Sequence, residues 1–261
     1  KNLKKSNADI IHSHYSLSAL TTSLALLFIT KRHHVVSLMG SDAKLKGIIK
    51  ILVNFFDKNH WKKTIVKSQQ MIKDTGLKDA VVIPNGLDIK TIKAIEAALQ
   101  NEIKDSTNEP TNTVLFAADP SRESKNYPLA EKSIKKTSGK LKVIYNQPHE
   151  KILAEILKTD VLLLTSRWEG SPNIIKEAMA CNCPIVSTNV GDVEWLFGNE
   201  PGHFITTFDP EDVAEKIEMA LEFSRKHGRT NGRERILELG LDSETVAGRI
   251  VGVYREVLSE T

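Results

Sequence analysis

The order of apolar segments along the chain constrains its fold more than any other feature. Short runs rich in Val, Ile and Leu alternate with longer segments of helical period over most of the sequence. This alternation is typical of βα units, in which a parallel sheet is buried on both faces. We expect strands at 8–12, 34–39, 63–67, 80–84, 113–117, 141–145, 160–165, 183–188 and 203–206. We expect helices at 16–30, 45–58, 127–138, 149–158, 172–181 and 211–226.

The predicted strands fall into two sets, which indicates two domains. Between Asn85 and Thr113 the sequence has a Pro-Asn-Gly turn, a polar helix and then a Ser/Thr/Asn/Pro tract without apolar periodicity. We therefore place the domain boundary there. The prediction is a front domain at 1–93, a linker at 94–112, a C-terminal Rossmann-like domain at 113–240 and a final capped helix at 241–261.

Charge is unevenly distributed between these parts. The net charge of the chain is +3, but residues 1–93 contain 16 Lys and Arg against 6 Asp, so they carry +10 and the remainder carries −7. A basic lobe favours an anionic partner such as a membrane phospholipid or a phosphorylated substrate, although solvated lysine-rich helix faces explain it equally well. Nucleic acid is the least favoured partner, because no aromatic interleaving or known binding module accompanies the charge.

The cysteines and the apolar runs indicate the compartment. Cys181 and Cys183 lie two residues apart, a spacing poorly suited to a disulfide and too sparse for a metal site, so we expect buried thiols in a reducing compartment. No segment reaches the roughly 20 apolar residues that a membrane span needs, and no signal peptide pattern is found. We expect a cytoplasmic protein whose contact with a membrane, if any, is peripheral.

Two glutamates eight positions apart flank a Gly-Ser-Pro turn in SRWEGSPNIIKEAMA. We expect Ser171 to cap the following helix and Pro172 to be its first residue. Since Ile174 cannot close a capping box, the amides of Asn173 and Ile174 are left open to an anion. Glu177 lies roughly 5–8 Å along the axis from the helix start, a separation that suits a diphosphate and its ribose hydroxyls. The alternative is a capped amphipathic helix with solvated glutamates.

The stretch EGSPNIIKEAMACNCPIV resembles the E-x7-E signature of the family 4 retaining glycosyltransferases. The similarity extends to DVLLLTSRWEG, STNVGDVEWL, IPNGLD and DIIHSHY, and NYPLAEK after SRESK is similar to bacterial enzymes of cell-surface polysaccharide synthesis, such as those of teichuronic acid. The resemblance implies a GT-B fold, in which two Rossmann-like α/β domains with parallel sheets face a cleft. It also implies that the helix at 241–261 crosses back to pack on the front domain.

The resemblance also implies roles for the glutamate block. Glu169 would accept hydrogen bonds from the donor sugar, and the amides from Gly170 to Asn173 would line the sugar and phosphate. Glu177 would bind the ribose diol of a nucleotide sugar, for which a UDP-sugar is the expected donor.

A basic pair of this family clamps the diphosphate, and Arg122 and Lys125 resemble it. They are three residues apart where five or six is usual, so Lys125 is the firmer assignment. A solvated loop of alternating charge is the alternative. Tyr145, Asn146 and Gln147 follow a predicted strand at a position where a loop could contact the nucleobase.

The front domain offers candidate acceptor contacts at the ends of two strands. His12 and His14 lie on one strand face, but no third ligand has a suitable spacing for a metal, and the resemblance makes His14 the substrate contact. Many relatives carry His-Gly where this sequence has Met39 and Gly40. Gly40 and Asp42 are the polar groups left at this turn.

Retention in such enzymes is attributed to front-face attack, in which the leaving diphosphate takes the acceptor's proton. The protein then stabilises the diphosphate and positions two substrates. The basic clamp would remove the need for a metal, so we predict metal-independent transfer to a saccharide or lipid-linked acceptor.

Other interpretations of the sequence remain open. Relatives carry a longer front domain with a first strand and a Gly-rich acceptor loop, so we expect this front domain to be truncated and transfer to be impaired. A non-catalytic docking subunit is favoured by Met39 and opposed by the intact glutamate pair. An epimerase or phosphorylase on the same fold fits less well, since the epimerase signature differs and phosphorylases need a pyridoxal lysine and a longer chain.

Overall fold

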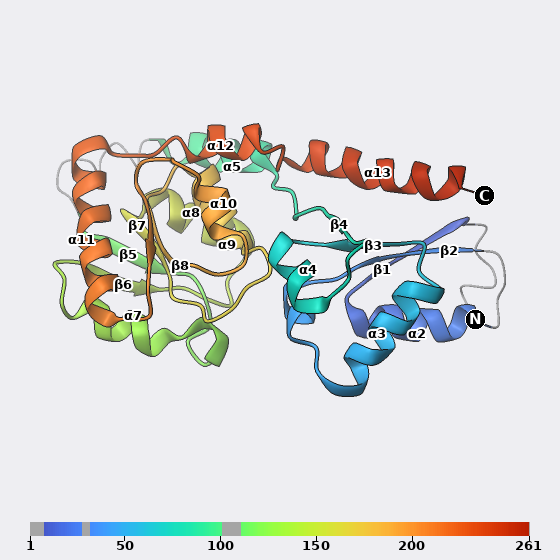
Figure 1. The fold of residues 1–261 in the computed structure, drawn as a ribbon. Helices are drawn as coiled ribbons and strands as arrows, with labels where there is room; N and C mark the ends of the chain where they lie inside the picture. Colours follow the sequence, from blue (N-terminus) through green and yellow to red (C-terminus); the bar gives the residue numbers. More distant parts are fainter. Residues whose placement is uncertain (1–7, 28–31, 101–110, 261) are drawn as a thin grey trace. The chain divides into compact units, whose positions relative to one another are not determined.

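The chain forms two compact α/β units. The computed structural model in Figure 1 describes residues 8–27, 32–100 and 111–260. One unit comprises residues 1–86 with 244–261, and the other comprises residues 87–243. Each is built on a fully parallel sheet, so the predicted fold class is confirmed.

The first unit has a four-stranded sheet of order β1-β2-β3-β4. Its strands are β1 (Ile10–His14), β2 (His33–Ser37), β3 (Lys63–Val66) and β4 (Val81–Val82). Its helices are α2 (Ser16–Leu26), the 3-10 turn η1 (Gly40–Lys44), α3 (Gly47–Asn59), α4 (Gln69–Thr75) and α13 (Ser243–Ser259).

Both faces of this first sheet are covered, because alternate side chains of each strand enter different clusters. Val36 and Val66 pack with residues of α2, α3 and α4. Val35 and Ile65 point to the opposite face and pack with Val253 and other apolar residues of α13. The C-terminal helix therefore completes the core of the first unit.

The second unit has a five-stranded sheet of order β6-β5-β7-β8-β9. Its strands are β5 (Thr113–Phe116), β6 (Lys140–Val143), β7 (Val161–Leu164), β8 (Ile185–Thr188) and β9 (His203–Thr206). Its helices are α5 (Ile89–Ala98), the 3-10 turn η2 (Glu123–Lys125), α7 (Tyr127–Ile134), α8 (His149–Lys158), α9 (Asn173–Ala180), α10 (Val193–Phe197), α11 (Pro210–His227) and α12 (Gly232–Glu238).

The middle of this sheet is buried on both sides. All four residues of β7 are buried, and its alternate side chains enter two different clusters. Leu162 and Leu164 pack with α5, α8, α9, α10 and α12, whereas Val161 and Leu163 pack with α7 and α11. Continuous apolar strands of this kind are what a parallel sheet between two helix layers requires.

All nine predicted strands are present, but the predicted linker at 94–112 is wrong in its first part. Residues 89–98 form α5, in which Ile89 and Ile92 are buried in the core of the second unit and Ile95 packs against it. This apolar stripe at helical spacing lies within a segment that is otherwise polar. The second unit therefore begins at residue 87 instead of 113, and residues 101–110 lie outside the described part of the chain.

Candidate functional site

Three loops meet at the carboxyl edge of the second sheet, where β5, β7 and β8 end side by side. The loop after β7 is bonded to the loop after β5, since the amide of Arg167 donates to the carbonyl of Ser124 at 2.8 Å and the Thr165 hydroxyl donates to the carbonyl of Lys125 at 2.9 Å. The Thr188 hydroxyl at the end of β8 donates to the carbonyl of Ser166 at 2.7 Å. In parallel α/β sheets this edge is where ligands bind.

Lys125 and Glu169 form an ion pair at this edge. Lys125 Nζ lies 2.6 Å from Glu169 Oε1, and the two side chains are 15% and 18% exposed. The Ser166 hydroxyl donates to the same carboxylate oxygen at 2.8 Å. The structure thus joins two residues that the sequence placed 44 positions apart, and a partly buried pair of this kind holds both groups in defined positions.

Helix α9 begins directly after this loop, and no side chain among the described residues caps its first amides. The predicted cap is wrong: the helix runs from Asn173, Pro172 precedes it, and the buried Ser171 hydroxyl has no hydrogen-bond partner among the described residues. The hydroxyl lies near Asp192 in the turn after β8 and does not bond the helix amides. The start of α9 therefore offers backbone N–H groups and positive dipole to an anion.

Glu177 lies one turn inside α9 and contacts the start of α8. Its carboxylate Oε1 is 3.0 Å from His149 Nε2, and its side chain is 12% exposed while that of His149 is 63% exposed. Ala178 and Met179, its neighbours along the helix, are fully buried in the core. The Glu177 carboxylate lies against another helix instead of in open water.

A buried polar cluster underlies the glutamate loop, and the sequence analysis missed it. Gly191 has φ of 63°, and a Cβ there would lie 2.7 Å from the carbonyl oxygen of Gly170, so the turn after β8 packs directly on this loop. Neither carboxylate oxygen of Asp192 has a hydrogen-bond partner among the described residues. Burial raises the pKa of Asp192 to about 6, against the opposing effects of Ser171 and Lys176. The buried Lys176 lies between Glu169 and Glu177 in sequence, and this lysine is the sequence signal that could have indicated the buried cluster.

Two other predicted donor contacts are not part of this arrangement. Arg122 is exposed, and its guanidinium forms no hydrogen bond or ion pair with the described residues, although its carbonyl accepts the Lys125 amide at 2.9 Å. Tyr145 is 48% exposed and lines a hollow of about 520 Å³. Asn146 and Gln147 line the same hollow.

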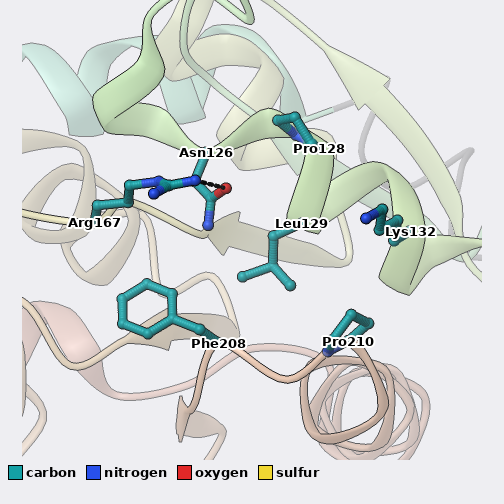
Figure 2. A pocket seen from close by; sticks show the side chains of 7 residues that line it. All are labelled: Asn126, Pro128, Leu129, Lys132, Arg167, Phe208 and Pro210. Carbon is teal, nitrogen blue, oxygen red and sulfur yellow. Dashed lines mark hydrogen bonds between the residues drawn. The ribbon is translucent and has the colours of Figure 1, made fainter.

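A further pocket, of about 570 Å³, lies beside these loops (Figure 2). Arg167 and Asn126 lie side by side at one wall of this pocket, with 3.5 Å between Nη2 and Oδ1. Its lining residues are Asn126, Pro128, Leu129, Lys132, Arg167, Phe208 and Pro210. None of the donor contacts predicted from the sequence is among them.

The predicted acceptor contacts lie at the carboxyl ends of β1 and β2 in the first unit. The rings of His12 and His14 are stacked with centroids 4.4 Å apart, which confirms that they share a strand face. The prediction for Asp42 is wrong, because its buried carboxylate accepts hydrogen bonds from the Ser16 hydroxyl at 2.7 Å and the Met39 amide at 2.7 Å. It closes the turn and has no face toward a ligand, whereas His14 is exposed and Gly40 is half-buried.

The remaining sequence predictions concern metals, thiols and membranes. In the described ranges, no three His, Cys, Asp or Glu side chains are grouped so that they could hold a metal ion. Cys181 and Cys183 are free and buried, as predicted, and burial raises the pKa of Cys183 to about 11. Within the same ranges no helix has the length and apolar character to cross a bilayer.

Comparison with known proteins places these features in a family. Residues 90–235 match the family of glycosyl transferases group 1. The chain is 24% identical to the glycosyltransferase TuaC of Bacillus subtilis, assigned to teichuronic acid biosynthesis, over 80% of this chain and 60% of TuaC. It is 20% identical to N-acetyl-alpha-D-glucosaminyl L-malate synthase of Bacillus anthracis, over 98% of this chain and 77% of that protein.

Solved structures share the fold at low identity. HepE of Anabaena, crystallised in complex with UDP, aligns with a TM-score of 0.79 at 16% identity, over 98% of this chain and 81% of HepE. A sucrose-phosphate synthase of Thermosynechococcus elongatus aligns with a TM-score of 0.70 at 17% identity, over 97% of this chain and 74% of that one. Since the family match covers more than half of the residues and includes Lys125, Glu169 and Glu177, the chain belongs to the glycosyl transferases of group 1.

Proposed function

We propose that this protein transfers a sugar from a UDP-sugar to a saccharide or lipid-linked acceptor, with retention of anomeric configuration. One observation carries the proposal: the Lys125–Glu169 pair lies at an uncapped helix start, and Glu177 follows one turn inside that helix. The complexes of HepE with UDP and with UDP-glucose support a nucleotide sugar as the donor.

Each group of the arrangement has a distinct task. The Lys125 ammonium and the amides at the start of α9 neutralise the diphosphate, and the helix dipole adds roughly 0.3–1 kcal/mol, too little to replace a cation. Glu177 accepts hydrogen bonds from the ribose diol, through the oxygen that does not contact His149 or by displacing that exposed ring. Glu169 accepts hydrogen bonds from hydroxyls of the donor sugar.

The transfer needs no protein nucleophile. The bond from the anomeric carbon to the diphosphate oxygen breaks, the acceptor oxygen forms its bond on the same face, and the diphosphate takes the acceptor's proton. The protein contributes electrostatic stabilisation of the departing diphosphate and orientation of both substrates. Because Lys125 supplies the positive charge, we predict full activity in excess EDTA. Loss of activity that magnesium restores would contradict metal independence.

Donor binding is measured by titration calorimetry with UDP and GDP. We expect UDP to bind, and Glu177→Ala to weaken it about ten- to a hundredfold, because a charged hydrogen bond contributes roughly 1.5–3 kcal/mol. Glu131→Ala, which removes an exposed carboxylate from α7 in the same unit, is the matched control and should leave the affinity unchanged. Binding of neither nucleotide, or an unchanged affinity in Glu177→Ala, would reject the proposal.

A second candidate is a non-catalytic docking subunit, which the apolar Met39 favours at a turn where relatives carry histidine. In that case the protein would bind neither UDP nor GDP, so the same titration separates the two functions.

We further propose a cytoplasmic protein that works at the inner face of the plasma membrane. The charge of +10 on residues 1–93 supports contact with anionic lipid. Co-sedimentation with vesicles should increase with their content of anionic lipid, and insensitivity to that content would contradict the membrane contact.

A further inference from the structure

Lys67 is a buried cation with no counter-charge among the described residues. It follows the last residue of β3, and its side chain is only 6% exposed. Its ammonium donates one long hydrogen bond, of 3.4 Å, to the carbonyl of Ile83. No carboxylate pairs with it in the part of the chain that the structure describes. Buried charges in proteins are normally paired, because desolvation of an isolated ion is costly.

The surroundings of Lys67 are imidazoles instead of carboxylates. Strands β1 and β3 are parallel and belong to one sheet, so His14 at the end of β1 and Lys67 after β3 lie at the same edge. Lys67 is close enough that its charge lowers the pKa of both His12 and His14. Desolvation lowers the pKa of Lys67 itself to about 8, so the ammonium is still charged near neutral pH.

The cluster is rigidly built and reaches the surface. His12 is fixed on both ring nitrogens, by the Tyr254 hydroxyl of α13 at 2.6 Å and by the Ser37 hydroxyl of β2 at 2.9 Å. His14 stacks on it and is exposed. The next residue, Tyr15, has φ of 76° and ψ of 141°, a backbone conformation that is rare for a residue with a side chain and is concentrated at functional sites.

We propose that Lys67 and His14 bind a phosphate group of the acceptor at the carboxyl edge of the first sheet. The identity of that ligand as acceptor rests on the proposed function, whereas the anion site rests on the first unit alone. A phosphate would supply the missing negative charge to the lysine and accept a hydrogen bond from the imidazole. His12 is a positioning residue that holds the ring of His14.

The test is calorimetric titration with inorganic pyrophosphate in the presence of saturating UDP. We expect Lys67→Met to weaken pyrophosphate about tenfold or more, the effect of one charged hydrogen bond. Lys63→Met is the matched control: it removes a lysine from the same strand, but one that is paired with Glu256 at 2.6 Å, and it should leave the affinity unchanged. Equal affinity of wild type and Lys67→Met would overturn the proposal, as would equal weakening by Lys63→Met.

Two further variants distinguish a folding defect from a loss of anion binding. Lys67→Arg keeps the charge and should retain most of the pyrophosphate affinity. If Lys67→Met does not fold, the affinities of Lys67→Arg and His14→Ala for pyrophosphate still test the site. His14→Ala should weaken pyrophosphate, and an unchanged affinity there would remove His14 from the site. UDP affinity should be the same in all of these variants. If UDP does not bind at all, the proposed function fails. The pyrophosphate titration is then repeated in a Lys125→Gln background, which removes the other proposed phosphate contact, and it still measures the effect of Lys67.

The source of the phosphate is distinguished with vesicles. Phosphatidylcholine vesicles that contain phosphatidic acid are compared with vesicles of phosphatidylcholine alone. Co-sedimentation that needs phosphatidic acid and falls in Lys67→Met indicates a lipid-linked phosphate. Pyrophosphate binding that depends on Lys67 without any vesicle effect indicates a soluble phosphorylated acceptor. Absence of Lys67 dependence with both probes would refute the anion site.

Discussion

Glu169 and Glu177 have different partners, although one turn and one helix start connect them. Glu169 is bonded to Lys125 and Ser166, and Glu177 is bonded to His149. The sequence predicted the two glutamates because their spacing is local. The Ser166 contact is local, but the contacts with Lys125 and His149 could not be predicted, because they depend on how separate loops and helices meet. Arg122 lies in the same loop as Lys125, but its exposed side chain does not join the ion pair, because proximity in sequence does not determine where a long side chain points.

At this scale we predict that Lys125 and Glu177 affect different parts of the nucleotide. Lys125→Gln should weaken UDP about tenfold or more and leave uridine unchanged, because the ammonium acts on the diphosphate. Glu177→Ala should weaken UDP and uridine alike. Competition binding against a fluorescent UDP analogue measures both, with Lys135→Gln as a control on an exposed lysine of the same unit. Equal losses for uridine and UDP in Lys125→Gln would contradict the assignment.

Elements were predicted more reliably than their ends and caps. Strands buried on both faces, such as β7, are fixed by runs of branched apolar residues. Helix α5 was missed as part of the second unit because its apolar stripe, which includes Ile89 and Ile92, is embedded in polar sequence. The cap of α9 was mispredicted because the Ser171 hydroxyl lies near Asp192 in the turn after β8, and no local signal reports that packing.

The turn after β8 should be sensitive to a single methyl group. Gly191→Ala places a Cβ 2.7 Å from the backbone oxygen of Gly170 and imposes a side chain at φ of 63°, so the glutamate loop has to move. We expect weaker UDP binding and a lower melting temperature. Gly228→Ala is the control, because its φ is 72° but no atom lies within 4 Å of the added carbon. It should cost only about 1 kcal/mol of stability and leave UDP binding intact. Equal effects of both variants would contradict the packing role.

In helix α13, by contrast, substitution of glycine by alanine should stabilise the protein. Gly248 and Gly252 lie in its interior, and a Cβ at either position would meet nothing within 4 Å. Each substitution by alanine should raise the free energy of unfolding of the first unit by about 0.5–1 kcal/mol, because alanine loses less backbone entropy in a helix. Chemical denaturation measures the change. A loss of stability would mean that the two glycines serve a close approach that the structure does not show.

At the scale of the whole molecule, both units contain histidines that are neutral in the fold. Burial lowers the pKa of His12 and His34 in the first unit and of His203 in the second to about 4. An unfolded histidine has a pKa near 6.5, so between pH 6.5 and pH 4 the unfolded chain binds protons that the folded chain does not. The stability that these neutral histidines contribute is therefore complete above pH 6.5 and is lost progressively as the pH falls toward 4.

His203 allows this acid sensitivity to be tested in one unit. Neither of its ring nitrogens has a hydrogen-bond partner among the described residues, and its ring stacks on Phe197 with centroids 4.9 Å apart. His203→Phe keeps the stacking and removes the titration, so it should stabilise the second unit by on the order of 3 kcal/mol at pH 4 relative to pH 7. The acid-unfolding midpoint should move to lower pH. An unmoved midpoint would show that His203 does not govern acid unfolding.

The central claim is that an uncapped helix start with Lys125 binds a diphosphate while Glu177 binds the attached ribose. A crystal structure of the protein with UDP tests it most directly. The account predicts phosphate oxygens within hydrogen-bond distance of Lys125 Nζ and the first amides of α9, and both ribose hydroxyls on the Glu177 carboxylate. UDP bound elsewhere, with Glu177 still held only by His149, would contradict it.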